Sequence, residues 1–296
     1  MVTGATGFTG IHFLNYMSTN YPEFDCYGLS RRSGNSQGYQ IVECDLFDRE
    51  KLTNVLVEIR PSYVVHLAGA TAPKSAAELW SANVGFTVGL IDSVSRAHIN
   101  PRILVVGSAA EYCPAGNSRV QEGDPVRGEG NYGLTKSIQT RCAIDLAIEH
   151  ELPLVIARTF NLIGPGLSTK FVGGALCAEA TAANADRPMR VGRTDSVRDF
   201  IDVRDAVTAY AKLVLNHELS GIYNVSTGVG TSIEELLQLI IRLADIDESL
   251  VVREPQARDS DIDRMVGDNS KMVKALQWAP EISLENTVAD MLDEYA

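Results

Sequence analysis

The sequence has few of the features that mark disulfide-bonded, metal-binding or membrane proteins. Its five cysteines are odd in number, with no CxxC pair and no histidine at ligand spacing, which argues against a disulfide framework and a structural zinc site. We expect no metal, and free buried thiols at Cys26, Cys44, Cys113, Cys142 and Cys177. No apolar run reaches the ~18 residues of a membrane span, and residues 1–9 lack the segments of a signal peptide. We therefore expect a cytoplasmic protein without a membrane partner.

Positive charge is also scarce. The 26 Lys and Arg residues are outnumbered by 38 Asp and Glu residues, which gives a formal net charge of −12. A phosphate backbone would be repelled overall, so nucleic acid is not an expected partner. With 296 residues, of which 45% are hydrophobic, the chain can bury one large core or two smaller ones that share a cleft.

Apolar strand-like runs alternate with helical patterns through the first half of the chain. We expect strands at 1–3, 26–29, 40–43, 63–67, 103–106 and 154–158, and helices at 7–20, 48–59, 78–97 and 132–150. This alternation predicts an α/β fold with a Rossmann-like doubly wound parallel sheet. Only Met1 and Val2 precede the first turn, whereas a strand usually has about five residues. We therefore expect the numbering to begin inside the first strand, with the natural start upstream.

The texture of the sequence changes after Phe160. The chain becomes richer in glycine and loops, and a last helix is expected at 284–295. We interpret this part as a smaller C-terminal substrate-binding lobe. Residues 1–160 are then the dinucleotide-binding domain, to which 199–215 return, and 161–198 with 216–296 form the substrate-binding lobe.

A glycine-rich loop, TGATGFTG at residues 3–10, stands between the first strand and the first helix. Glycines allow a tight turn and a close approach to a diphosphate, and the N-terminus of the following helix offers it N–H groups and a partial positive charge. A plain strand-to-helix turn is the alternative. The expected dinucleotide contacts in this loop are Gly4, Thr6, Gly7, Phe8 and Gly10.

The end of the second strand indicates which dinucleotide is bound. A carboxylate usually stands there when the cofactor is NAD, but LSRRSG offers Ser30, Arg31 and Arg32 instead. Guanidinium groups bind phosphate through paired hydrogen bonds, so NADP(H) is predicted in preference to NAD(H). The alternative is that both arginines belong to a solvated turn. Asp45 and Leu46 follow the third strand, where they could meet the adenine edge.

Three residues carry the predicted chemistry. Ser108 ends the fifth strand in VVGSAAEYC, at the sheet edge where ligands bind. Tyr132 and Lys136 lie four residues apart in NYGLTK and share one helix face. The hexapeptide alone also fits an ordinary amphipathic helix. A phenol with pKa ~10 needs about 4 kcal/mol of phenolate stabilisation to reach about 7, and a nearby ammonium can supply part of this. Tyr132 would then exchange a proton with the substrate oxygen, to which Ser108 donates a hydrogen bond.

Several motifs occur in order over nearly the whole chain, including TGATGFTG, HLAG, GSAAEYC, YGLTK, RTFNLIGPG, VRDFIDVRDAV and VGDNSK. On these motifs the sequence resembles the extended short-chain dehydrogenase/reductase family, also called the NAD-dependent epimerase/dehydratase family, in its nucleotide-sugar branch. The resemblance implies a catalytic triad of Ser108, Tyr132 and Lys136. It also implies dinucleotide contacts at Tyr132, Lys136, Leu67, Ala68 and Gly69.

The same resemblance implies a nucleotide-sugar substrate held by Asn161, Arg198 and Arg258. Two arginines from separate segments would clamp a diphosphate. The alternatives are that Asn161 caps a turn, that Arg198 pairs with a nearby aspartate, and that Arg258 lies on the surface. Cys113 replaces the glycine that usually follows the strand-five tyrosine, so this turn is expected to differ locally.

Within this branch, the motifs look most like GDP-4-keto-6-deoxy-D-mannose reductase and its relatives. The 4,6-dehydratases of the family carry an acidic pair after the catalytic Ser/Thr, whereas this chain has Ala109 and Ala110, and Glu111 is expected to be structural. We therefore expect NADPH-dependent reduction at C4 of a nucleoside-diphosphate 4-keto-6-deoxy sugar. A 4-epimerase and a non-catalytic dinucleotide sensor or scaffold remain the alternatives. The helices at 78–97 and 132–150 resemble the pair through which the family dimerises as a four-helix bundle, so a homodimer is expected.

Overall fold

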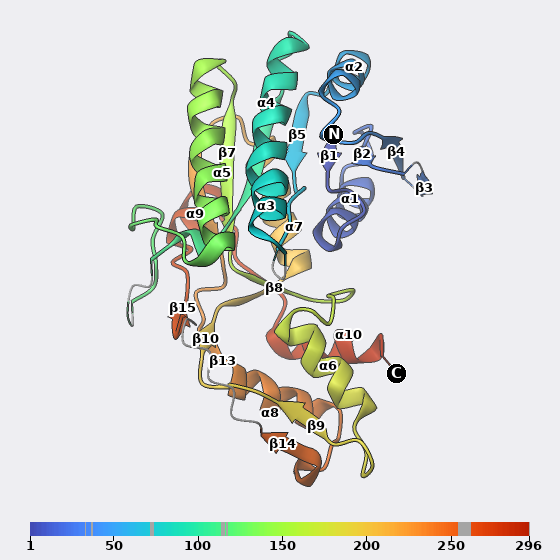
Figure 1. Cartoon of the computed structure of the whole chain (residues 1–296), viewed down its shortest axis with the longest axis vertical. Helices are drawn as coiled ribbons and strands as arrows, with labels where there is room; N and C mark the ends of the chain where they lie inside the picture. The colour runs from blue at the N-terminus through green and yellow to red at the C-terminus, as the bar shows by residue number, and fades with distance from the viewer. Residues whose placement is uncertain are drawn as a thin grey trace.

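The centre of the molecule is a twisted sheet. The structure, a computed structural model, describes residues 1–32, 34–36, 38–71, 74–113, 116, 118–253 and 262–295. Within these residues eight strands form the main sheet in the order β12-β7-β6-β5-β1-β2-β4-β3 (Figure 1). Their bounds are β1 (Val2–Thr3), β2 (Tyr27–Ser30), β3 (Gly34–Ser36), β4 (Tyr39–Glu43), β5 (Tyr63–His66), β6 (Arg102–Ser108), β7 (Leu154–Thr159) and β12 (Gly221–Val225).

The strand order locates the crevice of the sheet. Every neighbouring pair is parallel except β3 and β4, which form an antiparallel edge. The winding reverses between β1 and β5, and ligands of doubly wound sheets bind at the carboxyl ends of the strands near such a point. The predicted Rossmann-like fold is confirmed. The six predicted strands are present as β1, β2, β4, β5, β6 and β7, whereas β3 was not predicted.

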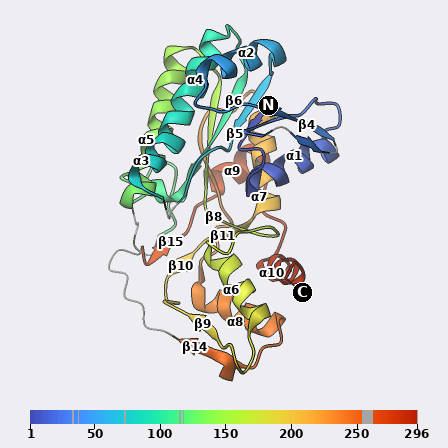
Figure 2. The same cartoon turned by 45° about the vertical axis from the view of Figure 1, so that its right-hand side comes forward.

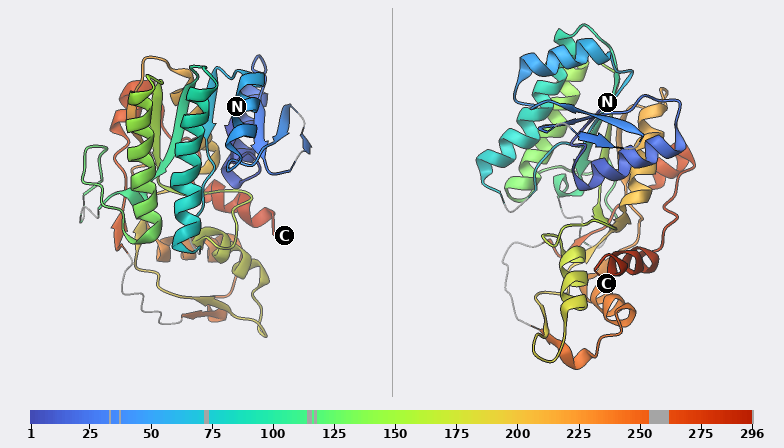
Figure 3. Two further views of the ribbon diagram at one scale, coloured as in Figure 1. Left: turned by 45° about the horizontal axis from the view of Figure 1, so that its top comes forward. Right: turned by 90° about the vertical axis from the view of Figure 1, so that its right-hand side faces the viewer.

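Helices cover both faces of the sheet (Figure 3). One face is covered by α1 (Phe8–Asn20), α7 (Val203–Leu215) and α9 (Ser270–Leu276), and the other by α2 (Arg49–Ile59), α4 (Phe86–Arg96) and α5 (Gly130–Glu149). The central strands are buried on both sides, which explains their continuous Val, Ile and Leu runs. The predicted helix at 78–97 is one rod with an interruption, because α3 (Ala76–Leu79) passes through a π-helical turn, η1 (Trp80–Gly85), into α4.

A smaller lobe lies below the carboxyl edge of the sheet (Figure 2). Its core is formed by α6 (Val172–Ala182), α8 (Ile233–Leu243) and α10 (Leu284–Asp293), beside the paired strands β9 (Met189–Val191) and β14 (Val251–Arg253). Short strands join it to the sheet: β8 (Asn161–Ile163), β10 (Val197–Arg198), β11 (Phe200–Asp202), β13 (Thr231–Ser232) and β15 (Arg264–Met265). The predicted last helix is present as α10.

The sequence-based boundary at residue 216 needs a correction. Strand β12 lies beyond it, yet it pairs with β7 at the edge of the main sheet. Helix α9 packs beside β12, and its Met272 belongs to the same core as α1 and α7. The alternating pattern of GIYNV was too short to distinguish an edge strand of the sheet from a strand of the second lobe.

The thiols differ in burial. All five cysteines are free, as predicted, but only Cys44 and Cys177 are fully buried, while Cys26, Cys113 and Cys142 are half-buried. No helix among the described residues is long and apolar enough to span a bilayer.

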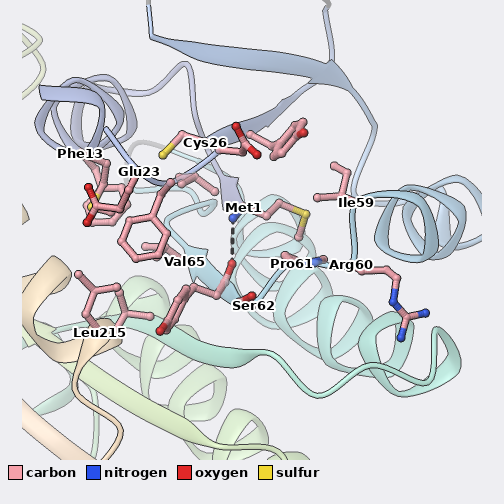
Figure 4. Close-up of a pocket in the computed structure, with 17 residues that line it drawn as sticks. Met1, Phe13, Glu23, Cys26, Ile59, Arg60, Pro61, Ser62, Val65 and Leu215 are labelled. Atoms are coloured by element: carbon pink, nitrogen blue, oxygen red, sulfur yellow. Dashed lines mark hydrogen bonds between the residues drawn. The ribbon is translucent and has the colours of Figure 1, made fainter. Parts of the chain in front are cut away.

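A cavity of about 270 Å³ lies at the amino edge of the sheet, around Met1 (Figure 4). The Met1 nitrogen donates a hydrogen bond to the Tyr63 carbonyl oxygen at 2.8 Å. Of the predicted site residues that the structure describes, none lines this cavity. Eleven of the predicted site residues lie instead around a cavity at the opposite edge.

Candidate active site

A larger cavity, of about 600 Å³, lies at the carboxyl edge of the sheet, where the smaller lobe meets it. Its walls come from the glycine loop, the ends of β5 and β6, the start of α5, β8 and the start of α6. Predicted site residues that line it are Gly4, Gly7, Phe8, Gly10, Leu67, Gly69, Ser108, Tyr132, Lys136, Asn161 and Arg198. Residues far apart in sequence thus meet around one space, as the motifs predicted.

The glycine loop is built for close backbone approach. Gly4 has a positive φ of 70°, and a Cβ there would lie 2.7 Å from the Ala68 nitrogen. A Cβ on Gly10 would lie 2.2 Å from the Gly4 oxygen, so a side chain at either position would push the loop apart. Gly7 precedes α1 without any side-chain cap. The first-turn N–H groups therefore stay open to an anion, which fits the diphosphate of a dinucleotide.

Tyr132 and Ser108 face each other across the cavity wall. Burial raises the pKa of Tyr132, and the negative charge of Glu111 adds to this effect, while a side-chain hydrogen bond with Ser108 acts in the opposite direction. Burial outweighs the hydrogen bond, so the pKa of Tyr132 in this arrangement lies above the ordinary value of a phenol. The phenol stays protonated at neutral pH.

Lys136 is almost completely buried at the bottom of the site. Its Nζ donates a hydrogen bond to the Val106 carbonyl oxygen at 2.7 Å. Burial lowers the pKa of Lys136 to about 8, with the charge of Glu111 acting in the opposite direction. The ammonium is therefore charged at neutral pH but easily neutralised above it.

Glu111 is turned away from the cavity. Its Oε1 accepts from the Ser108 N–H at 2.8 Å, and its Oε2 accepts from Arg158 Nε at 2.8 Å, with both side chains buried. The Arg158 guanidinium also lies 4.7 Å from the centre of the Tyr112 ring. The prediction that Glu111 is a structural carboxylate is thus confirmed. It fixes the backbone of Ser108 and cannot reach a ligand in the cavity.

The substrate side of the cavity is formed by the smaller lobe. Asn161 begins β8, and Arg198, at the end of β10, donates from Nη1 to the Val197 oxygen at 3.0 Å. Apolar side chains from both lobes complete this side of the wall: Leu162, Ile163, Leu167, Phe171, Val172, Phe200, Ile262 and Met265. Arg258 lies outside the described residues.

Several predicted cofactor residues lie outside the cavity wall. Arg31 and Arg32 are exposed just after β2, where the Arg32 N–H donates to Ser30 Oγ at 3.3 Å. Thr6 and Asp45 are exposed as well, Leu46 is buried, and Ala68 is half-buried behind the loop. These residues lie outside the wall of the main cavity.

Sequence reasoning missed several lining residues. Thr71, Asn83, Thr159 and Phe160 all line the cavity. Thr159 and Phe160 follow β7 at the same carboxyl edge as Ser108, and this strand-end position could have identified them. Asn83 gave no such signal, because it lies within a helical pattern.

Known proteins resemble this chain over its full length. Residues 1–291 match the protein family described as GDP-mannose 4,6 dehydratase. The chain is 25% identical to GDP-6-deoxy-D-mannose reductase of Pseudomonas aeruginosa, covering 99% of this chain and 96% of that protein. The solved structure of RMD from Pseudomonas aeruginosa complexed with NADPH has a TM-score of 0.84 and 24% identity, with 99% and 97% covered. UDP-glucose 4-epimerase of Thermus thermophilus, in complex with NAD, has a TM-score of 0.86 and 21% identity, with 99% and 97% covered.

The family match and the geometry agree. The glycine loop, the strand order and the grouping of Ser108, Tyr132 and Lys136 are what the resemblance to the extended short-chain dehydrogenases/reductases implied. The two solved structures, one with NADPH and one with NAD, share this fold over almost the whole chain. The chain therefore belongs to the GDP-mannose 4,6-dehydratase family, within the extended short-chain dehydrogenases/reductases, and is an NAD(P)-dependent enzyme of nucleotide-sugar metabolism.

Proposed function

We propose that this enzyme uses NADPH to reduce the C4 keto group of a nucleoside-diphosphate 4-keto-6-deoxy sugar, with a GDP-sugar favoured. One observation carries the proposal: Ser108, Tyr132 and Lys136 line a cavity in which the described residues contribute no carboxylate, imidazole or thiol. Such a site can donate a proton and stabilise an oxyanion, but it has no second acid and base. This set of side chains suits reduction of a carbonyl group.

Dehydration would need more than the cavity provides. Elimination of water across two carbons requires an additional acid and base, yet Ala109 and Ala110 occupy the positions after Ser108. Glu111, the nearest carboxylate in the sequence, is held behind the wall by Arg158. A dehydratase is therefore disfavoured, although the matching family is described by that reaction.

Tyr132, Ser108 and Lys136 would each have a separate role in the reduction. Tyr132, protonated at neutral pH because burial raises its pKa, donates a proton to the sugar oxygen as negative charge develops there. Ser108 donates a hydrogen bond to the same oxygen. The charge of Lys136, fixed against Val106, stabilises the phenolate that remains. The reduced dinucleotide supplies the hydride, which no side chain can provide.

The positions of the described site residues support the cofactor and substrate assignments. The glycine loop and the uncapped start of α1 fit a diphosphate, and the exposed Arg31 and Arg32 at the end of β2 fit the 2′-phosphate of NADP(H). Ser30, Asp45, Leu46 and the 67–69 turn would hold the rest of the dinucleotide. Asn161, Arg198 and Arg258 would hold the nucleotide sugar. In this proposal the main sheet with its helices, β12 and α9 included, binds the dinucleotide, and the smaller lobe binds the sugar nucleotide.

The deciding experiment supplies NADPH or NADH with a panel of nucleotide 4-keto-6-deoxy sugars and follows the loss of reduced-cofactor absorbance. A reductase consumes one NADPH for each sugar alcohol formed, and replacement of both Arg31 and Arg32 by alanine should abolish the preference for NADPH over NADH. Interconversion of C4 epimers without net cofactor consumption would instead identify an epimerase. Full function of the Tyr132→Phe variant would indicate a sensor or scaffold.

A further inference from the structure

A chain of buried hydrogen bonds runs from the glycine loop to the catalytic helix. Its five side chains come from β1, β5, α4, η1 and α5, and each is completely buried: Thr3, His66, Thr87, Asn83 and Thr135. Buried polar side chains need partners, because an unpaired group costs its full desolvation penalty. Every link in this chain has one, so the route can be followed atom by atom.

The directions of the bonds fix the state of the histidine. The Thr87 hydroxyl contacts the Asn83 carbonyl oxygen at 2.8 Å, and because a carbonyl only accepts, Thr87 must donate there. Thr87 Oγ1 also lies 2.9 Å from His66 Nε2, so this nitrogen must carry the hydrogen. Nδ1 of a neutral imidazole then accepts from the Thr3 hydroxyl at 2.7 Å. Thr3 Oγ1 in turn accepts from the Ala68 N–H at 3.2 Å.

The other end of the chain reaches Tyr132. The Asn83 amide holds the end of the 67–70 turn through two hydrogen bonds. Its Oδ1 accepts from the Ala70 N–H at 2.8 Å, and its Nδ2 donates to the Ala70 oxygen at 3.1 Å. Nδ2 also donates to Thr135 Oγ1 at 3.0 Å. The Thr135 hydroxyl then donates to the Tyr132 carbonyl oxygen at 2.9 Å.

A protonated His66 could not make the same hydrogen bonds. Protonation of His66 would turn Nδ1 into a donor and leave the Thr3 hydroxyl without its acceptor. It would also place a second positive charge near Lys136 in a fully buried position, and burial with this repulsion lowers the pKa of His66 to about 3. The neutral Nε2–H form is the one state in which every bond is made.

We propose that His66, in its Nε2–H tautomer, is a positioning residue that holds the 67–70 turn and the first turn of α5 in one fixed arrangement. The inference rests on the proposed function, in which this turn contacts the dinucleotide and Tyr132 donates the proton. Loss of one link would then weaken dinucleotide binding and turnover together. Loss of the Tyr132 hydroxyl would lower turnover alone.

The tautomer can be tested without any ligand. Nitrogen-15 NMR of the wild-type protein should show His66 with a protonated Nε2 and an unprotonated Nδ1, unchanged between pH 8 and pH 5. A protonated Nδ1, or titration of His66 in this range, would overturn the proposal. The result is independent of whether the enzyme is a reductase.

The positioning role is tested with matched threonine variants. Thr87→Val removes two links, whereas Thr140→Val changes a buried threonine on α5 whose hydroxyl has no partner among the described residues. We expect Thr87→Val to raise the Kd for NADPH and to lower kcat by roughly fivefold each, the ratio that one buried hydrogen bond of ~1 kcal/mol gives. Thr140→Val should change neither, and Thr87→Ser should restore both.

Three outcomes separate the possible failures. Equal behaviour of the Thr87→Val and Thr140→Val variants, with circular dichroism showing both folded, would overturn the positioning role while the proposed function stands. If the wild-type protein binds neither NADPH nor NADH, the proposed function fails, and the NMR measurement still decides the tautomer. A drop in kcat alone in the Thr87→Val variant would also count against the proposal, because the link to the dinucleotide turn would then be absent.

Discussion

Burial sets the charge state of the residues on which the proposed chemistry depends. Tyr132 and Lys136 stand on the same helix face, and desolvation disfavours the charged form of each. The phenol is thereby kept as a proton donor. The pKa of the Lys136 ammonium is lowered toward neutral pH, so a moderate rise in pH removes its charge, whereas an exposed lysine would keep it.

The pH dependence of turnover should report Lys136. The pKa of this lysine is lowered to about 8, so its positive charge is present below that pH and lost above it. We expect kcat/KM for the NADPH-dependent reduction to fall above about pH 8, since this ratio reports groups of the free enzyme. Lys136→Arg should keep a charge and move the fall to higher pH, even if its rate is lower. An identical fall in both proteins would assign it to another group.

Acid stability should report His66. Its pKa in the folded protein, about 3, lies below the ordinary value of 6.5, so the unfolded chain binds a proton that the folded chain does not. The free energy of unfolding should therefore decrease as the pH falls from 6.5, by at most about 1.4 kcal/mol per pH unit from this group. In urea titrations at pH 6.5 and pH 5, His66→Gln should show a shallower decrease than the wild type. An equal decrease in the free energy of unfolding between these pH values in both proteins would mean that His66 is not buried in its neutral form.

Individual site residues differ in how far the sequence could predict them. Ser108, Tyr132 and the glycines were predictable because strand ends and helix spacing fix their position locally. The roles of His66 and Asn83 were not, because their partners lie 13 to 63 residues away and only the fold brings them together. The raised pKa of Tyr132 was also missed, since burial cannot be judged from spacing.

At the scale of elements, the turn after β6 depends on a buried ion pair. Glu111 lies in the short helix η2 (Ala109–Glu111), and Arg158 lies on the neighbouring strand β7. The Glu111 carbonyl oxygen also accepts from the N–H groups of Arg127 and Gly128 at 3.1 and 3.0 Å, just before α5. One residue thus connects the strand that ends in Ser108 with the segment that leads into the catalytic helix.

Breaking this pair should cost more than removing it. Glu111→Gln leaves a buried guanidinium without its counter-ion, and we expect the free energy of unfolding to fall by about 3–5 kcal/mol. The double variant Glu111→Leu with Arg158→Met leaves neither charge of this pair behind, so its loss should be smaller than the sum of the losses of the single variants Glu111→Leu and Arg158→Met. Urea denaturation of the wild type, the two single variants and the double variant provides the measurement. Additive losses would contradict a coupled pair.

The elements themselves followed the sequence pattern wherever the apolar period was long. The helices α1, α2 and α5 and the central strands agree with their predicted ranges to within two residues. The π-helical turn η1 was not predicted, because the apolar pattern continues through it. The side chain of Asn83, within this turn, bonds to Ala70 and Thr135. The segment of strand β12 was assigned to the smaller lobe because its partner β7 lies about 65 residues earlier in the chain.

At the scale of the whole molecule, one buried carboxylate joins the lobes. Asp199 lies between β10 and β11, and its Oδ1 accepts from the N–H and the hydroxyl of Thr227 at 2.8 and 2.7 Å. Its Oδ2 accepts from the N–H groups of Gly228 and Gly267 at 2.9 and 3.2 Å. Segments that follow β12 and β15 are thereby tied to the residue after Arg198, which fixes where this arginine enters the cavity.

The face of the sheet that α4 and α5 cover is the expected surface for dimer formation. Helices α4 and α5 pack side by side on one face of the sheet (Figure 1). Ile148, near the end of α5, is 72% exposed, the highest value among the large hydrophobic side chains that the structure describes. The homodimer that we propose, in which both helices pair with their copies as a four-helix bundle, would give this side of the sheet a partner.

Sedimentation at micromolar concentration tests the dimer, which should have twice the 32.1 kDa mass of the chain. Ile148→Glu should weaken the dimer by at least about tenfold, because burial of an isoleucine contributes roughly 1.5–3 kcal/mol and a carboxylate there would be desolvated. Val229→Glu is the matched control, since Val229 is 60% exposed but lies in the loop before β13, outside both helices. It should leave the mass unchanged. A wild-type protein that sediments as a monomer would rule out the bundle, and equal dissociation of both variants would move the interface elsewhere.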